Sequence, residues 1–508
     1  MSALTLSGIS SAWYASLRYP VINPTNRKCS TVPILSLNNQ YSRNFHLSWL
    51  GFFVAFLSWF AFSPLIPDVI KTDLKLTSEQ VGNSNIVSLC STLIVRVISG
   101  PLVDRYGPRK VMASLLIIGA IPSGLAGTIS TANGLYIVRF FIGILGATFV
   151  SCQAWNTAFF DKNVVGRVEF TANALGGGWG NAGGGFTFII MIALFNQLLA
   201  DGMSPHVAWR VAFAIVPVPI LLSVAAATLM FGTDHPAGKW CDRYEAVATA
   251  LSASDNQTGS INGKHAKTKS GYDTETGDEK DIQVTVTAIN LVSELDTAVN
   301  KPLSLNVAYE IILNPLTWLP SLAYMTTFGY ELAIDANLAT VLYTLLKSPT
   351  FGQTKAGYIA GIYGLLNVFA RLLGGYFGDL IYVKFGVPGK KYLTIACGVV
   401  QGLLSVGLGL YIDNHPHPTL TVIIVIFVIL AIFNEVANGA NFSLVPHCNP
   451  NSNGFMTGIV GAMGNLGGIF FAIIFRFAPS PSGKAFWISG VIAISVNLLL
   501  CIIRVPQF

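Results

Sequence analysis

Residues 174–185 read Ala-Leu-Gly-Gly-Gly-Trp-Gly-Asn-Ala-Gly-Gly-Gly, a glycine-rich run inside an otherwise apolar segment. In water each glycine would destabilise a helix by about 1 kcal/mol relative to alanine. In a lipid bilayer the helix persists, because its backbone groups have no water to bond with. We therefore expect a membrane helix in which Gly176, Gly180 and Gly184, spaced four residues apart, form one face. A second helix is expected to pack on that face at backbone distance.

A shorter copy of this run occurs near the other end of the chain, where residues 464–468 read Gly-Asn-Leu-Gly-Gly. Its glycines Gly464 and Gly468 again lie one helical turn apart, and Asn465 corresponds to Asn181 of the first run. One copy in each half indicates an internal repeat, which is typical of membrane transporters built from two related bundles.

The composition indicates an integral membrane protein. Of the 508 residues, 52% are hydrophobic and 11% are charged, whereas soluble domains carry about 25% charged residues. The net charge of +6 comes without a basic tract, so we expect no nucleic-acid partner. The seven cysteines are scattered, and neither a metal-ligand spacing nor a nucleotide-binding loop is evident. We expect no metal, no cofactor and no enzymatic activity.

The hydropathy pattern predicts an all-α membrane protein with twelve transmembrane helices in two six-helix bundles. Each apolar segment has about the 20 residues needed to cross a bilayer. The expected spans are 44–66, 81–103, 111–131, 134–158, 170–197, 209–231, 311–340, 356–382, 391–411, 418–445, 455–477 and 485–504.

Polar stretches divide the chain and suggest its orientation. We expect an N-terminal tail (1–43), an N-terminal bundle (44–231), a central loop (232–305), a C-terminal bundle (306–505) and a short C-terminal tail (506–508). The tails, the central loop and the loops on their side of the membrane carry more Lys and Arg than the loops on the other side. Both termini and the central loop are therefore expected to be cytoplasmic. The composition of the central loop is typical of a disordered linker, and a phosphorylation-controlled segment is the open alternative.

Two arginines occupy equivalent positions in the two halves. Arg96 is followed by a glycine at i+4 and by Asp104 at i+8, and Arg371 is followed in the same way by Asp379. Eight helical residues span about 12 Å. If each aspartate marks the cytoplasmic surface, each arginine lies near the middle of an apolar layer roughly 30 Å thick.

A buried arginine in a membrane needs either an acidic partner or a visiting anion. The acidic residues expected near mid-depth are Glu331, Asp335 and Glu435. In one interpretation each arginine forms an ion pair with one of them and only holds helices together. In the other, the two arginines form a cationic site at the midplane, where such proteins bind their substrates. Arginine favours a planar, oxygen-bearing anion, which it holds with paired N–H bonds.

Several motifs then resemble a known family. Residues 100–110, Gly-Pro-Leu-Val-Asp-Arg-Tyr-Gly-Pro-Arg-Lys, resemble the loop signature of the major facilitator superfamily. Its characteristic positions are Gly100, Asp104, Arg105, Gly107 and Arg109. The two glycine- and asparagine-rich runs, 178–185 and 461–468, resemble the paired nitrate signatures of the nitrate/nitrite porter family. The long central loop is similar to the fungal type, and Arg167–Phe170 look inserted relative to the family pattern.

The resemblance implies roles for individual residues. Arg96 and Arg371 match the family's substrate-binding arginines. The further substrate contacts that it implies are Thr92, Asn181, Asn465, Phe56, Phe149 and Tyr324. The glycine-lined fifth and eleventh helices are expected to be the surfaces that slide as access alternates.

The implied function is secondary active import of nitrate, and of nitrite, across the plasma membrane by a protein that acts as a monomer. Proton symport is expected, because an anion must enter against a negative interior. Glu331 is the candidate proton-coupling residue, because a carboxylate inside a membrane is a functional suspect. The alternatives are a nitrate/nitrite exchanger and a nitrate sensor on a transporter fold.

Overall fold

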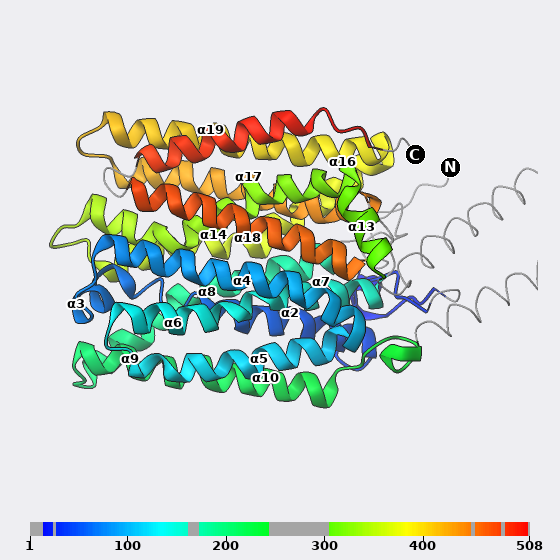
Figure 1. The fold of residues 1–508 in the computed structure, drawn as a ribbon, viewed down its shortest axis with the longest axis horizontal. Helices are drawn as coiled ribbons and strands as arrows, with labels where there is room; N and C mark the ends of the chain where they lie inside the picture. Colours follow the sequence, from blue (N-terminus) through cyan, green and yellow to red (C-terminus); the bar gives the residue numbers. More distant parts are fainter. Residues whose placement is uncertain are drawn as a thin grey trace, which may run out of the picture.

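The computed structural model describes residues 14–23, 27–160, 172–242, 304–448, 453–478 and 483–505. In these ranges the regular elements are helices, and β-structure is limited to isolated bridges. The expected insertion at 167–170 and most of the expected central loop lie outside the described residues. The long helices run side by side along one axis, and the first and the last described residues lie at the same end of the bundle, which we call the terminal end (Figure 1).

The N-terminal half contains six long helical crossings. They are α2 (Gln40–Trp59), α4 (Ser78–Tyr106), α5 (Pro108–Gly124), α6 (Ala132–Ile142) continued by η3 (Gly143–Ala147) and α7 (Thr148–Phe159), α8 (Ala172–Ala200), and α9 (Pro205–Ile215) continued by α10 (Pro217–Phe231). Short elements η1 (Ile66–Ile70), α3 (Lys71–Asp73), η2 (Leu125–Thr128) and η4 (Trp240–Asp242) connect or follow them.

The C-terminal half begins with a short helix, α13 (Leu305–Leu313), at the terminal end (Figure 1). Its long helices are α14 (Pro315–Leu346), α15 (Gln353–Leu365) continued by α16 (Asn367–Asn414), α17 (Leu420–Cys448), α18 (Asn453–Phe477) and α19 (Gly483–Leu500). Residue Gly386 interrupts α16 with φ 62° and ψ −157°, so α16 turns back there and contributes to two crossings. A positive φ of this kind favours glycine.

The chain is a multi-pass membrane protein. Nine helical segments within the described ranges are long and apolar enough to cross a membrane, and one of these, 353–414, contains the turn at Gly386. The 20-residue α2 and the 32-residue α14 complete twelve crossings. The structure therefore has the expected all-α architecture with twelve crossings.

Helix ends differ from the predicted spans where local chemistry interrupts a helix. The first span was expected to reach residue 66, but α2 ends at Trp59 and a turn leads into the π-helical η1. The span expected at 209–231 is divided at Val216, because Pro217 has no N–H to continue the α9 ladder. The fourth span changes from α- to 3-10-helix at Gly143.

The two halves pack against one another through the helices that carry the two glycine-rich runs. Helix α18 packs on α4 of the other half (Figure 1). Helix α8 packs on α15 and α16 of the other half. At the end opposite the termini, Gln353 Oε1 accepts hydrogen bonds from the backbone N–H groups of Asp68 and Val69, at 2.8 and 3.0 Å. Arg476 of α18 there pairs with Glu79 of α4 at 2.9 Å. Polar contacts thus join the halves at that end.

The predicted glycine face of α8 is wrong in its details. A Cβ at Gly176 would meet the Asn156 side chain, and one at Gly180 would meet the Phe52 ring, while Gly184 has only ordinary contacts at 3.4 Å or more. Close backbone approach occurs instead at other glycines of the run. These are Gly178 against Asn367 O, Gly183 against Phe53 O and Gly185 against Leu365 N. These neighbours belong to α2, α7, α15 and α16, so the glycines of α8 contact several helices rather than forming one face.

In the second run, Gly464 and Gly468 face side chains, whereas Gly467 faces backbone. A Cβ at Gly464 would lie 2.7 Å from the Tyr324 ring and 2.8 Å from the Phe328 ring. A Cβ at Gly468 would lie 3.3 Å from the Leu332 side chain. The close backbone contact is made by Gly467, whose Cβ would lie 2.0 Å from Met325 O. The glycine at 464 therefore leaves room for two aromatic rings rather than for a helix backbone.

Candidate functional site

Arg96 lies fully buried on α4 and connects the two halves of the chain. Its Nε donates to Gly146 O at 2.8 Å, and its Nη1 donates to Gly461 O of α18 at 2.9 Å. Its Nη2 has no hydrogen-bond partner among the described residues. The guanidinium therefore keeps one donor free for a ligand.

The 3-10 segment η3 explains part of this geometry. Thr92 Oγ1 donates to Gly143 O at 2.5 Å. Thr92 lies one helical turn before Arg96, whose Nε donates to Gly146 O. A Cβ at Gly143 would lie 2.5 Å from Ser88 O, so glycine permits α4 and η3 to approach closely. The irregular segment offers its carbonyl oxygens to buried side chains. Thr92 thus positions η3, and its hydroxyl hydrogen is already used.

Aromatic rings cover the Arg96 guanidinium. Its Cζ lies 4.8 Å from the centroid of Phe149 and 5.2 Å from that of Phe328. Phe328 stacks on Tyr324 with centroids 4.6 Å apart and planes 3° apart. Contacts of this kind stabilise a cation in a site without water. They do not neutralise its charge.

Arg371 lies on α16 beside the same rings and is also buried. Its Cζ is 5.6 Å from the Phe328 centroid, so one ring lies close to both guanidinium groups. Its Nη1 donates to Gly177 O of α8 at 3.3 Å, and its Nη2 to Tyr324 Oη at 3.5 Å. The structure therefore brings the two arginines together, from opposite halves of the chain.

Carboxylates surround Arg371 only. Glu331 Oε2 lies 3.6 Å from Arg371 Nη2, and Glu435 Oε2 lies 3.5 Å from Arg371 Nε. No described carboxylate forms an ion pair with Arg96. The interpretation in which acidic residues pair with the arginines thus holds for Arg371 and fails for Arg96. The site has one compensated and one uncompensated guanidinium.

Asparagines hold Glu331 in place. Its Oε1 accepts from the side-chain amides of Asn181 and Asn367, the latter at 2.8 Å, and its Oε2 accepts from Asn438 at 2.9 Å. Asn181 comes from α8 of the N-terminal half, whereas the other two come from α16 and α17. The predicted polar residue of the first signature therefore contacts the carboxylate directly. Its contact with Arg371 is indirect.

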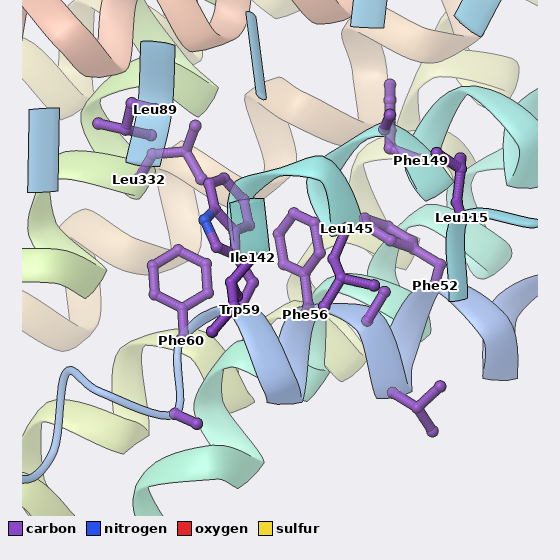
Figure 2. Close-up of a cluster of buried hydrophobic side chains, with 14 of the residues drawn as sticks. Phe52, Phe56, Trp59, Phe60, Leu89, Leu115, Ile142, Leu145, Phe149 and Leu332 are labelled. Atoms are coloured by element: carbon purple, nitrogen blue, oxygen red, sulfur yellow. The ribbon is translucent and has the colours of Figure 1, made fainter. Parts of the chain in front are cut away.

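The asparagine of the second signature lies beside Arg96. Asn465 Nδ2 donates to Gly461 O at 3.1 Å, the same carbonyl oxygen that accepts from Arg96. Its Oδ1 has no hydrogen-bond partner within the described part of the chain. The predicted contact Phe56 packs among other aromatic rings of α2, with its ring centroid 4.4 Å from that of Phe52 and 5.0 Å from that of Trp59 (Figure 2).

The remaining predicted motif residues lie at the terminal end. Gly107 has φ +90° and makes the one-residue turn between α4 and α5. Arg109 Nη1 donates to Gly232 O at 2.8 Å, which ties this turn to the end of α10. Asp104 O accepts from Trp240 Nε1 at 2.9 Å, Arg105 lies over the Tyr106 ring, and Gly100 lies against Gly458. Apart from Gly100, which lies one helical turn from Arg96, this motif therefore belongs to helix packing away from the arginines.

Phe328 and Asn438 were not among the predicted site residues. Phe328 follows Tyr324 by four residues, so helical spacing alone places both rings on one face of α14. Asn438 follows Asn434 at the same spacing and donates to it at 3.3 Å. In the sequence, Asn438 could have been recognised from the polar i, i+4 pair that it forms with Asn434 inside an apolar segment.

The fold and a buried, partly uncompensated cationic site between two helical halves define a secondary transporter. Residues 48–472 match the family model described as Major Facilitator Superfamily. The chain is 32% identical to the "High affinity nitrate transporter 2.5" of Arabidopsis thaliana, over 97% of this chain and 86% of that protein. It is 27% identical to the "Nitrate/nitrite transporter NrtP" of Nostoc punctiforme, over 88% and 89% of the two chains.

The chain belongs to the major facilitator superfamily and, within it, to the nitrate/nitrite porter family. It is therefore a member of a transporter family and not an enzyme. Its fold is also similar to that of the proton:xylose symporter XylE, with a TM-score of 0.59, 15% sequence identity, and coverage of 92% of this chain and 97% of that one.

Proposed function

We propose that this protein imports nitrate, and also nitrite, by proton symport through a site formed by Arg96 and Arg371. The observation that carries the proposal is the Arg96 guanidinium, which is completely buried, lacks an acidic partner among the described residues and retains one free donor. A buried charge of this kind is costly unless an anion visits it. The names of the similar proteins supply the class of anion.

The shape of the site suits a small planar oxyanion. Arginine binds such anions with parallel N–H···O bonds. The flat, nearly parallel rings of Tyr324 and Phe328 lie beside both guanidinium groups. A weakly hydrated, planar monoanion can give up its water in such surroundings more easily than a compact, strongly hydrated one. Asn465 Oδ1 accepts hydrogen bonds only, so its amide would have to turn to contact the anion.

Proton symport follows from the direction of transport. Moving one negative charge inward costs about 2.3 kcal/mol for each 100 mV of a negative interior. Two or more protons for each nitrate would make the moving charge positive. Glu331 is our candidate carrier, because it lies fully buried 3.6 Å from Arg371 and contacts both halves of the chain.

Alternating access would open one end of the bundle at a time. The polar contacts of Gln353 and Arg476 join the two halves at the end opposite the terminal end, which supports a conformation that is closed at that end. We assign that end to the outside, with both termini in the cytoplasm and the two six-helix bundles, 44–231 and 306–505, as the moving bodies. A monomer in the plasma membrane suffices for this cycle.

Current recording in oocytes that express the chain tests the proposal. Nitrate should evoke an inward positive current that grows as the outside becomes more acidic, and labelled nitrate should accumulate. Labelled nitrate uptake that needs internal nitrite, without current, would favour the exchanger. Nitrate binding without any accumulation would favour the sensor.

A further inference from the structure

Two glutamates meet at one guanidinium. Asn438 Nδ2 donates to Glu331 Oε2 at 2.9 Å and approaches Glu435 Oε2 at 3.4 Å. The same two oxygens lie 3.6 and 3.5 Å from nitrogens of Arg371. Both carboxylates are fully buried. They therefore form a pair that shares one amide donor and one cation.

This pair and an anion would compete for Arg371. The guanidinium Nε and Nη2 face the two glutamates, and these are among the donors that a bound oxyanion would use. One positive charge cannot compensate two buried carboxylates and an additional anion, because like charges at this distance cannot all remain ionised. An anion that binds Arg371 must therefore displace the glutamates or neutralise them.

We propose that Glu331 and Glu435 are the two proton carriers, and that each takes up one proton when nitrate replaces it at Arg371. The proposal rests on nitrate transport at the two-arginine site. In each step a carboxylate oxygen leaves the guanidinium and forms an O–H bond with a proton from water on the open side. When nitrate leaves, both protons leave and the carboxylates return to Arg371.

The charges of the cycle balance with this assignment. In the empty site, two arginines face two ionised glutamates, so the four groups carry no net charge. In the loaded site, two arginines, two neutral glutamates and one nitrate carry one positive charge. The empty protein can therefore return without opposing the membrane potential, and the loaded one moves inward with it.

Other titratable or charged groups face the pair from neighbouring helices. They are Arg96 of α4, Tyr324 and Asp335 of α14, Tyr363 of α15 and Arg371 of α16. Asp335 is the third buried carboxylate, one turn beyond Glu331. It forms no ion pair with either arginine, and its Oδ1 has no hydrogen-bond partner, within the ranges that the structure describes. We assign it no part in the exchange at Arg371, which makes it a matched control.

Proton uptake on nitrate binding tests the proposal in the unaltered protein. Purified protein in weakly buffered detergent solution is mixed with potassium nitrate while a pH indicator reports protons and calorimetry reports bound nitrate. We expect about two protons for each nitrate, and tighter nitrate binding as the pH falls, because the two ligands are thermodynamically linked. Nitrate binding with one proton or none overturns the two-carrier assignment alone. Absence of nitrate binding overturns the proposed function as well.

Matched variants then assign the carriers. For wild-type protein in oocytes, the ratio of charge to labelled nitrate should be about one positive charge per nitrate. Glu435→Gln should lose one proton per cycle, so that nitrate enters with almost no current, whereas Asp335→Asn should keep the wild-type ratio. A wild-type ratio in Glu435→Gln, or its loss in Asp335→Asn, overturns the assignment. Surface labelling confirms that each variant reaches the membrane, and the titration of the unaltered protein decides the case if Glu435→Gln does not.

Discussion

The Arg96 guanidinium of the N-terminal half donates a hydrogen bond to Gly461 O of the C-terminal half, at 2.9 Å. The opposite arrangement occurs for the other arginine, because Arg371 Nη1 donates to Gly177 O at 3.3 Å. Each acceptor lies four residues before the asparagine of its own glycine-rich run. Each glycine-rich run therefore accepts a hydrogen bond from the arginine of the opposite half of the chain.

Alanine in place of a glycine at this interface should impair transport. A Cβ at Gly178 would lie 2.7 Å from Asn367 O and 3.2 Å from Arg371 Cβ. Because backbone cannot yield as a flexible side chain does, we expect Gly178→Ala to lower the rate of labelled nitrate uptake at least about tenfold. Gly407→Ala is the control, since no atom lies within 4 Å of its added Cβ. Equal uptake by both variants would contradict the close approach of α8 and α16.

Replacement of Arg96 by lysine should weaken nitrate binding although it keeps the charge. Lysine has no planar fork, so it would lose the bonds to Gly146 O and Gly461 O or the free donor. We expect the Kd for nitrate to rise about tenfold or more, measured by calorimetry on purified protein. Arg105→Lys, on the exposed turn side of α4, should leave the Kd unchanged. Wild-type affinity in Arg96→Lys would argue against recognition by paired N–H groups.

Phe328, whose ring lies close to both guanidinium groups, should contribute more to nitrate affinity than Phe56, the ring inferred from the family resemblance. Phe328→Leu removes an aromatic face within 5.2 and 5.6 Å of the two guanidinium carbons. Loss of such contacts in a buried site corresponds to about 1–2 kcal/mol, so nitrate affinity should fall roughly tenfold. Phe56→Leu should have a smaller effect, because Phe56 packs among other rings (Figure 2). The reverse order in binding assays would restore Phe56 as the primary contact.

A carboxylate outside the membrane-spanning segments should make stability depend on acidity. Burial raises the pKa of Asp73, but hydrogen bonds from His206, Arg210 and Trp209 outweigh this and hold the pKa below its ordinary value. A lowered native pKa contributes stability that is complete above the pKa of the unfolded chain and disappears as the pH falls through the native pKa. Wild-type protein should therefore melt about 2 °C above Asp73→Asn at pH 6.

That difference in Tm should narrow as the pH falls below the ordinary value of 3.8 and through the lowered native pKa, because native Asp73 then takes up a proton. Thermal unfolding in detergent, followed by tryptophan fluorescence, measures it. Asp201→Asn is the control, since Asp201 is an exposed carboxylate that bonds within its own helix end. A gap between wild-type protein and Asp73→Asn that does not narrow on acidification would show that packing rather than charge determines the effect.

The sequence was a good guide to residues that repeat between the two halves. The equivalent positions of Arg96 and Arg371 predicted that the two side chains would lie together, and the structure brings both beside one ring, Phe328. It was a poor guide to direction around a helix with several neighbours. The glycines of α8 contact α2, α7, α15 and α16, and not the single helix expected for a face formed by Gly176, Gly180 and Gly184.

Hydropathy, helical spacing and the cost of burying charge are local properties of the chain, so the class of fold, the internal repeat and the two buried arginines could be predicted without coordinates. Which charges meet depends on the packing of helices from distant parts of the chain. Glu331 and Glu435 are more than 100 residues apart in sequence, and their common approach to Arg371 depends on how α14, α16 and α17 rotate and pack. Such packing leaves Arg96 without an acidic partner among the described residues and makes two symmetric arginines unequal.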